Sequence, residues 1–400
     1  MLTILLGGFT AFGPLSMDLY LPAFPQLAAD FGTGPAAVQL TLTADVLGLV
    51  VGQLVLGPLS DAYGRRRLLI GSALVCAVAS VLCALAPTIG LLVLWRFLQG
   101  ASGGGGIVQL GAGVHLISRW LQMKAGVTLA GAGKGITTIK AGPTFLSTAG
   151  NHGGHPGIST DNADNITIRN LTLDMSGDTN DGNLTGRTSE YCVDIRTSTN
   201  VLVSNVAVRN PYTYSIAAAG ADHFRITGCD VTITSNGRYD QLDQIHVLNS
   251  NTGIIDNNLV DAGTSPDADD GLVAHTLGAG GTVHHIRYLN NKVRCGQGGH
   301  LLQAALGADG NTIHDILIAD NELWGSTRGV MVGWYSTTTA TVDKVSIDGN
   351  DFHDNGYAVD IATVGANLTN TTATNNRTHA TGVLQIAAGT GNSVSGTTPY

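Results

Sequence analysis

The stretch DNITIRNLTLDMSG (residues 164–177) carries the pattern that decides the fold. Apolar and polar residues alternate on both sides of a central asparagine, as in two short β-strands joined at a bend. The plan recurs in TNVLVSNVAVRN (199–210), in DHFRITGCDVTITS (222–235) and onward to VDKVSIDGNDFHDNG (342–356), at intervals of 23 to 35 residues. One such unit cannot bury its apolar side alone, so the repetition predicts a solenoid. We expect an all-β, right-handed parallel β-helix over residues 108–400.

A second regularity emerges when the expected coils are aligned by their first apolar strand residue. Two positions before that residue, successive coils carry Tyr191, Tyr214, Asp243, Asp270, His300, Arg328 and Tyr357, at spacings of 23, 29, 27, 30, 28 and 29 residues. Parallel strands stack about 4.8 Å apart. These side chains are therefore expected to form one row along the edge of the solenoid.

The row has the composition of a glycoside hydrolase site. Asp269 and Asp270, with Asp243 one coil earlier, place carboxyl groups close enough that one can stay protonated as an acid while another acts as a base. His300 could support the acid. Substrate could be held by four residues: Arg328, Tyr214, Trp334 and Tyr357. A second interpretation remains open, because an aspartate before a strand commonly bonds its own turn and aligned tyrosines can simply stack.

The global composition mixes two different regions. Residues 1–107 carry four basic and four acidic residues and no histidine, so the formal charge of −9 and all 12 histidines belong to the remainder. An acidic β-region argues against nucleic acid as a partner, because binding it requires neutralisation of phosphates. The five cysteines show neither metal-ligand spacing nor a disulfide framework. We expect no cofactor and no metal in a hydrolase.

Residues 1–107 are expected to be helical and membrane-embedded. Apolar stretches near the length that crosses a bilayer cover four ranges: roughly 1–17, 38–59, 68–88 and 89–108. The expected domains are thus a transmembrane unit of three to four helices (1–107) and the β-helix (108–400). Arg65–Arg67 should be cytoplasmic by the positive-inside rule, which favours an extracytoplasmic β-helix. The β-helical half alone is of the secreted or surface type.

Three segments of this region carry recognisable motifs: GPLSMDLYLPAFPQLAADF (13–31), GPLSDAYGRRR (57–67) and WRFLQG (95–100). Together they resemble drug exporters of the bicyclomycin-resistance type in the major facilitator superfamily. The resemblance implies membrane helices. Such transporters use twelve helices in two repeats around a central site, so three or four helices are not expected to transport. We interpret the chain as a fusion joined near the glycine run 103–106.

The region from about 107 to 400 resembles the pectate-lyase-like superfamily, with GGGIVQLGAGVHLIS (104–118) as its entry segment. Within it, the order of acidic, imidazole and guanidinium groups is similar to that of polygalacturonases. The resemblance implies that Asp269 is the general acid, that Asp243 and Asp270 activate water, and that His300 and Arg328 support the acid and bind substrate. The chain departs from that family in having QLDQ (241–244), GGHLL (298–302) and RGVMVGW (328–334), the last without a lysine.

The leading expectation is therefore a polysaccharide hydrolase. Two alternatives stay open. One is a polysaccharide lyase or C5-epimerase, in which Tyr214 or His246 acts as acid or base, with calcium as a possible cofactor. The other is a non-catalytic glycan-binding solenoid. The remaining histidines of interest are expected at turns or on the surface: His246, His275, His284, His285 and His314.

Overall fold

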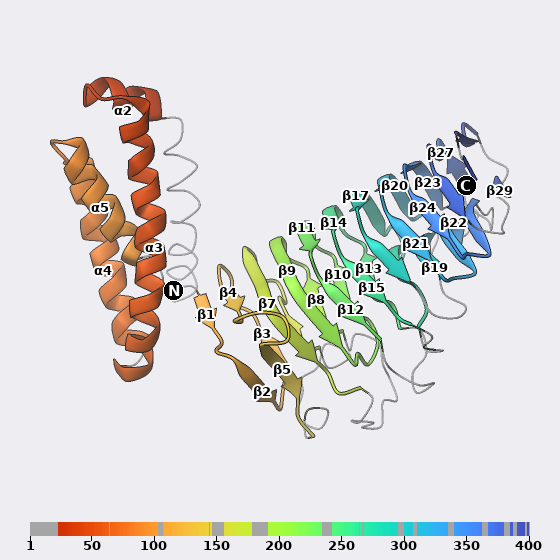
Figure 1. The fold of residues 1–400 in the computed structure, drawn as a ribbon, viewed down its shortest axis with the longest axis horizontal. Helices are drawn as coiled ribbons and strands as arrows, with labels where there is room; N and C mark the ends of the chain where they lie inside the picture. Colours follow the sequence, from red (N-terminus) through yellow and green to blue (C-terminus); the bar gives the residue numbers. More distant parts are fainter. Residues whose placement is uncertain are drawn as a thin grey trace. The chain divides into compact units, whose positions relative to one another are not determined.

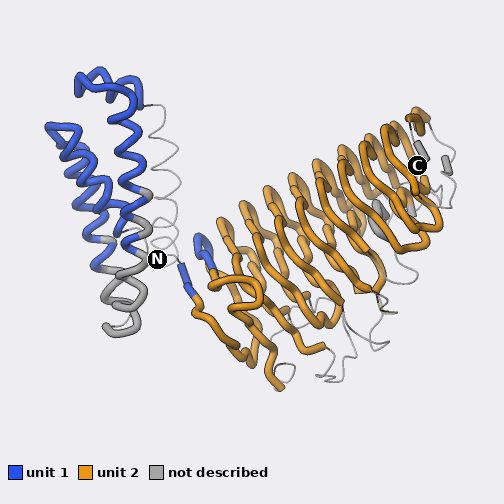
Figure 2. The backbone as a smooth tube through the Cα atoms, in the orientation of Figure 1, with its two compact units in different colours: residues 1–109, 125–129 blue, residues 110–124, 130–400 orange. Residues whose placement is uncertain are grey.

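The chain forms two compact units, residues 1–109 with 125–129 and residues 110–124 with 130–400 (Figure 2). The computed structural model describes residues 23–400 apart from 64, 103–106, 144, 146–155, 178–190, 234–241, 264, 266–267, 295–299, 307–309, 335–339, 362–366, 380–384, 387–389, 397 and 400.

The first unit is mainly helical (Figure 1). Its described helices are α2 (Phe24–Asp30), α3 (Pro35–Tyr63), α4 (Arg65–Ala84) and α5 (Ile89–Ser102). Helices α3 and α5 approach closely through glycines, because a Cβ atom on Gly52 would collide with the backbone of Ala101, and one on Gly100 with the backbone of Asp45. Small residues at such a crossing let two helix backbones come together.

The helices cover much of the apolar sequence, with boundaries that differ from those expected. The ranges 38–59, 68–88 and 89–108 fall largely on α3, α4 and α5, whereas 1–17 lies outside the described residues. Within the described part of the chain, no helix combines the length and hydropathy needed to cross a bilayer. The transmembrane character expected for residues 1–107 is therefore not confirmed.

The second unit winds as a coil of parallel strands, as its tube shows in Figure 2. One sheet, here called sheet B, contains β3 (Leu121–Gln122), β6 (Ile158–Ser159), β8 (Val193–Arg196), β10 (Ile216–Ala219), β13 (Ile245–Leu248), β16 (Leu272–Thr276), β19 (His300–Leu306), β22 (Arg328–Trp334), β25 (Tyr357–Ile361) and β29 (Gln385–Ile386).

The remaining strands form sheet A, in which each coil contributes one long strand or two shorter ones. They are β1 (Ile107–Gln109), β2 (Gly113–Ile117), β4 (Thr128–Ala130), β5 (Thr137–Ala141), β7 (Ile166–Asp174), β9 (Thr199–Arg209), β11 (Asp222–Thr227), β12 (Asp230–Thr232), β14 (Asn251–Asp256), β15 (Leu259–Asp261), β17 (Thr282–Leu289), β18 (Lys292–Arg294), β20 (Thr312–Ala319), β21 (Glu322–Trp324), β23 (Thr341–Asp348), β24 (Asp351–His353), β26 (Asn367–Thr369), β27 (Thr372–Thr374), β28 (Arg377–His379), β30 (Ser393–Ser395) and β31 (Thr398–Pro399). The parallel β-structure expected after residue 107 is confirmed.

The core lies between the two sheets and is built by the alternation seen in the sequence. In sheet B the in-register residues Val193, Ile216, Ile245 and Leu272 are fully buried. From sheet A, Ile226, Ile255, Tyr288 and Ile318 fill the same interior. Each side chain stacks on its equivalent in the next coil, so one repeated position stabilises the whole array.

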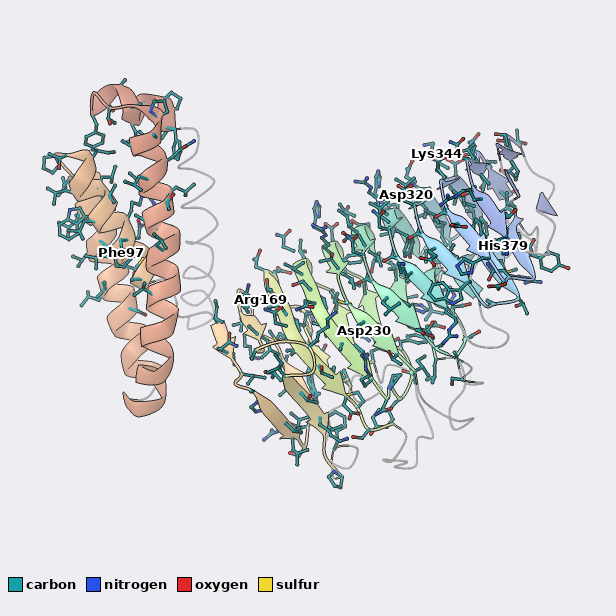
Figure 3. The ribbon with its side chains drawn as sticks, viewed as in Figure 1. Phe97, Arg169, Asp230, Asp320, Lys344 and His379 are labelled. Carbon is teal, nitrogen blue, oxygen red and sulfur yellow. The ribbon has the colours of Figure 1, made fainter. Side chains whose placement is uncertain are left out.

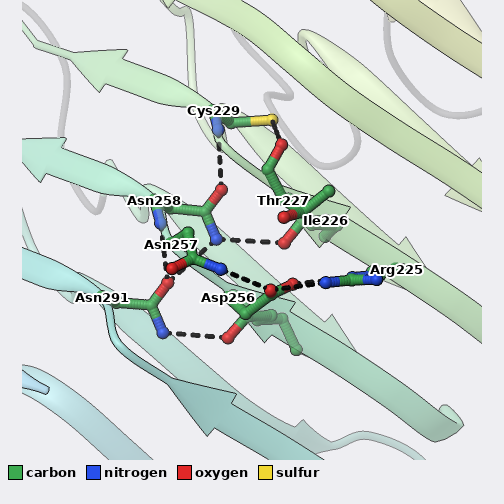
Figure 4. A network of polar contacts seen from close by, with 9 residues as sticks. Arg225, Ile226, Thr227, Cys229, Asp256, Asn257, Asn258 and Asn291 are labelled. Atoms are coloured by element: carbon green, nitrogen blue, oxygen red, sulfur yellow. Dashed lines mark hydrogen bonds and ion pairs between the residues drawn. The ribbon is translucent and has the colours of Figure 1, made fainter. Parts of the chain in front are cut away.

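A ladder of buried asparagines closes one corner of the coils (Figure 4). The amide Nδ2 of Asn258 donates to Oδ1 of Asn291 at 2.9 Å, and Asn291 donates to Asn321 at 3.0 Å. Asn321 and Asn350 continue the chain to Asn376. Each amide also donates to a main-chain carbonyl, as Asn258 does to Ile226. A buried polar group is tolerated when its hydrogen bonds are made, and here the partners come from adjacent coils.

Bends in sheet A use residues in the left-handed backbone region. Most are asparagine, aspartate or glycine, which adopt positive φ at low cost. His223 (φ 52°) and His285 (φ 55°) adopt the same conformation, which histidine tolerates better than most residues, whereas it is unusual for the β-branched Thr252 (φ 53°). Exposed Asp320 and Lys344 occupy two further such positions, at one edge of the coils (Figure 3).

Candidate active site

The seven residues expected to align do so, at the N-terminal ends of successive strands of sheet B. The amide of Cys192 donates to the carbonyl of Tyr214, that of Ser215 to Asp243, and that of Gln244 to Asp270, each at 3.0 Å. Farther along the sheet, His300 pairs in register with Arg328 and Arg328 with Tyr357. We call this set the row. Its order follows from parallel pairing, which places equivalent positions of successive coils side by side.

Three carboxylates meet in the middle of the row. One oxygen from each of Asp243, Asp269 and Asp270 lies within 4.8 Å of the other two. Asp243 and Asp270 are 4% and 6% exposed, whereas Asp269 is half-buried. Carboxylates this close cannot all ionise cheaply, which favours a proton held among them. The most accessible member, Asp269, is the one suited to give that proton to a substrate.

Asp243 is held in place by two hydrogen bonds. Its Oδ1 accepts the main-chain N–H of Asp270 at 3.1 Å, and its Oδ2 lies 2.5 Å from Nδ1 of His246, which donates in the Nδ1–H tautomer. His246 is 3% exposed on β13. The expectation of a turn or surface position is therefore wrong for His246, because the second residue of this strand points into a covered part of the site.

Aromatic rings continue from His246 along the row. The imidazole stacks on the Tyr214 ring at 4.4 Å between centroids, and Tyr214 stacks on Tyr191 at 4.9 Å. His275 meets His246 edge-on at 5.5 Å. The column packs Tyr214 closely and leaves it only half-buried. Both interpretations of the tyrosines, substrate contact and stacking, thus remain compatible with its position.

The local electrostatics keep these groups neutral. Burial, with repulsion from Asp243, raises the pKa of Tyr214 above its ordinary value. Burial lowers the pKa of His246 to about 4, with Asp270 and Asp269 partly opposing the shift. Burial also lowers the pKa of His275 to about 4. Near neutral pH the tyrosine therefore keeps its proton and both imidazoles are uncharged.

Arg328 and Tyr357 occupy the C-terminal part of the row. Nε of Arg328 lies 3.4 Å from Oδ2 of Asp360, and Tyr357 is 38% exposed. The backbone of Trp334 pairs with Ala305. The side chains of His300 and Trp334 lie outside the described part of the structure, so their roles stay predictions.

One cationic residue near the row was missed by the sequence analysis. Arg196, on β8, binds Oδ2 of the buried Asp194 through Nε at 2.9 Å, and its guanidinium lies 5.6 Å from the Tyr191 ring centroid. Strand β8 lies two strands before β13, and β22 lies two strands after β16. The register places the backbone of Arg196 level with Leu248 and His275, at the opposite end of the strands from the carboxylates, and its guanidinium reaches back only toward Tyr191. The only signal in the sequence was the position of Arg196 three residues after Val193, on the outward face.

The same carboxylates form the one cluster in the described residues whose ligand atoms converge as a cation site requires. Oxygen ligands of this kind suit calcium or magnesium. However, both oxygens of Asp243 already have partners in His246 and the Asp270 amide. The arrangement accordingly fits proton transfer better than a site in which all three carboxylates bind a cation.

The buried imidazole makes the stability of the second unit depend on pH. The pKa of His246 is about 4 when folded and about 6.5 when exposed, so the unfolded chain takes up a proton first as pH falls. The contribution of His246 to stability is therefore expected to be fully present above about pH 6.5 and to be lost as the pH falls toward 4. Urea unfolding at a series of pH values should show a smaller loss for His246→Asn, whereas His223→Asn, at an exposed bend, should behave like the wild type.

Comparisons with known proteins bear on the two units separately. Residues 4–139 match the model of the Major Facilitator Superfamily, a range that continues past the end of α5 at Ser102. An uncharacterized MFS-type transporter of Bacillus subtilis is 48% identical over 107 residues, which are 27% of each chain. A bicyclomycin resistance protein homolog of Haemophilus influenzae is 34% identical over 107 residues, again 27% of each chain. The chain thus spans about a quarter of the length of these curated relatives.

The β-helix resembles a solved polygalacturonase from Erwinia carotovora ssp. carotovora. The TM-score is 0.55 at 15% sequence identity, and the match covers 73% of this chain and 87% of that chain. At this identity the likeness concerns the fold. The resemblances inferred from the sequence are therefore confirmed: an exporter-like N-terminal region precedes a β-helix with a polygalacturonase-like fold.

Proposed function

We propose that residues 108–400 form a polysaccharide hydrolase whose active site is the row on sheet B. The observation that carries this proposal is the convergence of Asp243, Asp269 and Asp270 within 4.8 Å. Asp269 is the general acid that protonates the glycosidic oxygen. Asp270, with Asp243 held by His246, accepts a proton from the attacking water. The neutral imidazole keeps Asp243 oriented without adding positive charge.

The electrostatics favour hydrolysis over the alternative lyase or epimerase chemistry. Abstraction of a C5 proton needs a base that is ready to accept it at the working pH. The raised pKa of Tyr214 makes the phenolate costly to form, and His246 is almost completely buried. Neither candidate base is suited to that step. The carboxylate cluster, in contrast, contains groups for both halves of a hydrolysis.

The basic residues support a substrate that carries carboxylate groups. Arg328 lies in the row two strands after Asp270, and an arginine can bind a carboxylate through two parallel hydrogen bonds. Arg196 adds a second positive charge beside Tyr191, although its Nε is already bound to Asp194. Tyr357 adds an exposed ring at the end of the row. A uronate-containing polysaccharide combines the hydroxyl groups and charge that such a surface recognises.

Product analysis of the full-length chain tests the reaction type. The chain is incubated with a panel of acidic and neutral polysaccharides, and the products are followed by reducing-end assay, ultraviolet absorbance and mass spectrometry. Hydrolysis gives new reducing ends and products heavier by one water, without an unsaturated sugar. Absorbing, unsaturated products would replace the proposal with elimination. Binding without any turnover would replace it with a glycan-binding role.

Replacement of Arg328 tests its proposed contact with substrate. Arg328→Gln is expected to raise KM about tenfold and to change kcat little, because the lost interaction would be made equally in the bound substrate and in the transition state. Arg377→Gln is the matched control, since Arg377 pairs with Asp351 on sheet A and is 60% exposed. Equal KM values for Arg328→Gln and the control would remove Arg328 from the substrate site.

We further propose that residues 1–107 attach the β-helix to a membrane and do not transport. Their similarity to exporters over about a quarter of those proteins supports this role. Fractionation of cells expressing the chain tests it: the protein should sediment with membranes and resist extraction by alkaline carbonate. Recovery in the soluble fraction, or efflux of a drug by the chain, would contradict the proposal.

A further inference from the structure

A groove of about 690 Å³ lies on sheet A, outside the row. It crosses five successive coils, which contain β7, β9, β11, β14 and β17. Each coil lines the groove with residues of one three-residue segment at a bend in sheet A. The first residue of each segment has a positive φ: Asn165, Asn200, His223, Thr252 and His285. These bends lie side by side on successive coils and line the groove.

The sequence of the groove contains a His-X-Arg triplet twice, with an apolar residue in the centre each time. His223-Phe224-Arg225 and His285-Ile286-Arg287 lie two coils apart, in register through Thr252-Gly253-Ile254. In both triplets the histidine and the arginine are exposed and the central residue is buried. The Phe224 ring occupies the space that a side chain on Gly253 would need. The ring thereby forms part of the floor between the two basic pairs.

The groove has a positive character in an acidic protein. None of its described lining residues is acidic, although the chain carries a net charge of −9. Arg225 is fixed by Asp256 through Nε and Nη2 at 2.8 and 2.7 Å, in a pair that does not involve its Nη1 group (Figure 4). Arg287 makes no ion pair within the part of the chain that the structure describes. One guanidinium is therefore held rigidly, and the other brings an uncompensated charge.

We propose that this groove is a second glycan site, which binds a linear oligosaccharide carrying carboxylate or sulfate groups. The two arginines lie two strand spacings apart, about 10 Å. Arg287 can bind one anionic group through its guanidinium, and Arg225 can donate to a second one through Nη1, which its pair with Asp256 does not use. Ile254, between the two arginines, and Leu202, on the coil before Arg225, contact the apolar faces of the sugar rings. The groove lies on a different sheet from the row, so this site needs no catalysis and stands independently of the hydrolase proposal.

Binding to full-length variants tests the proposal. The background is Asp269→Asn, chosen to prevent turnover, and the probe is a fluorescent galacturonate hexamer, with a sulfated hexamer and a neutral glucose hexamer of equal length as comparisons. Arg287→Gln is expected to weaken binding of the anionic probes about tenfold. Thr252→Asp should do the same by placing a carboxylate between the two triplets, at a bend where aspartate fits better than threonine. Arg377→Gln, on the same sheet but outside the groove, should bind like the parent.

The outcomes separate this site from the row. Loss of anionic binding in Arg287→Gln and Thr252→Asp, with hydrolysis of a short substrate unchanged when Asp269 is restored, supports a second site. The relative affinity for the carboxylated and sulfated hexamers identifies the anionic group. Equal binding by Arg287→Gln, Thr252→Asp and Arg377→Gln, or equal affinity for the neutral hexamer, would overturn it. The binding measurement can be made even if the chain has no hydrolase activity. Failure of the hydrolase proposal can therefore be distinguished from failure of this one.

Discussion

Asp269→Asn is expected to reduce polysaccharide hydrolysis about 10²- to 10⁴-fold, the range that one general acid contributes. Asparagine preserves the size of the side chain but cannot protonate the leaving oxygen. Asp269 is half-buried at the edge of the carboxylate cluster, so its replacement should leave the fold intact. Initial rates on the best substrate of the panel, with a thermal unfolding curve for each variant, provide the measurement.

Asp354→Asn serves as the control for a charge change on the β-helix. Its carboxylate is 74% exposed and its φ is 57°, a conformation that asparagine adopts readily. Its activity should match that of the wild type. An active Asp269→Asn variant would remove the general acid from the proposed mechanism. Loss of activity together with a lower melting temperature would indicate damage to the fold and would require Asp270→Asn as a second probe of the cluster.

Asn321→Ala should cost about 3–5 kcal/mol of unfolding free energy. Asn321 is 1% exposed and donates to the carbonyl of Tyr288 and to Oδ1 of Asn350, at 3.0 and 2.9 Å. Its own Oδ1 accepts from the amide N–H and from Nδ2 of Asn291. Alanine removes every one of these bonds and leaves buried partners unsatisfied, at about 1–3 kcal/mol each.

Chemical denaturation with hydrogen exchange measures this loss. Asn367→Ala is the matched control, because Asn367 is exposed at the start of β26 and its main-chain amide, which the substitution retains, bonds to Ala340. The control should lose less than about 0.5 kcal/mol. Exchange should quicken first in the coils that contain Asn291, Asn321 and Asn350. A loss below about 1 kcal/mol for Asn321→Ala would mean that water or a neighbouring group replaces the ladder bonds.

The sequence predicts the row well because parallel strands stack in register, so that residues one coil apart in the sequence lie side by side in the sheet. Intervals of 23 to 30 residues between Tyr191 and Tyr357 were enough to align the backbone positions of seven residues, since each interval is one coil. The bond between His246 and Asp243 could not be predicted in the same way. Asp243 precedes its strand, and its direction depends on the turn backbone, which alternation of apolar residues does not specify.

The groove was missed for a related reason. Asparagine at residues 165 and 200 and histidine at 223 and 285 favour a left-handed bend, but the β-branched threonine at 252 does not. The conformation of Thr252 follows from stacking on the neighbouring coils, which is a tertiary effect. The helices were located by their apolar content, yet α3 begins and ends outside the expected range 38–59 because hydropathy does not mark caps.

Because of the asparagine ladder, the side of a coil that contacts the preceding coil is complementary to the side that contacts the following coil. Asn321 accepts from the coil before it and donates to the coil after it, in the same way as Asn291 and Asn350. Duplication or loss of one complete coil would therefore restore every bond at the new junction, whereas a partial insertion would interrupt the series. Insertions and deletions in this protein should be tolerated when they add or remove complete coils. Each added coil would lengthen every row of stacked side chains, on both sheets, by one residue.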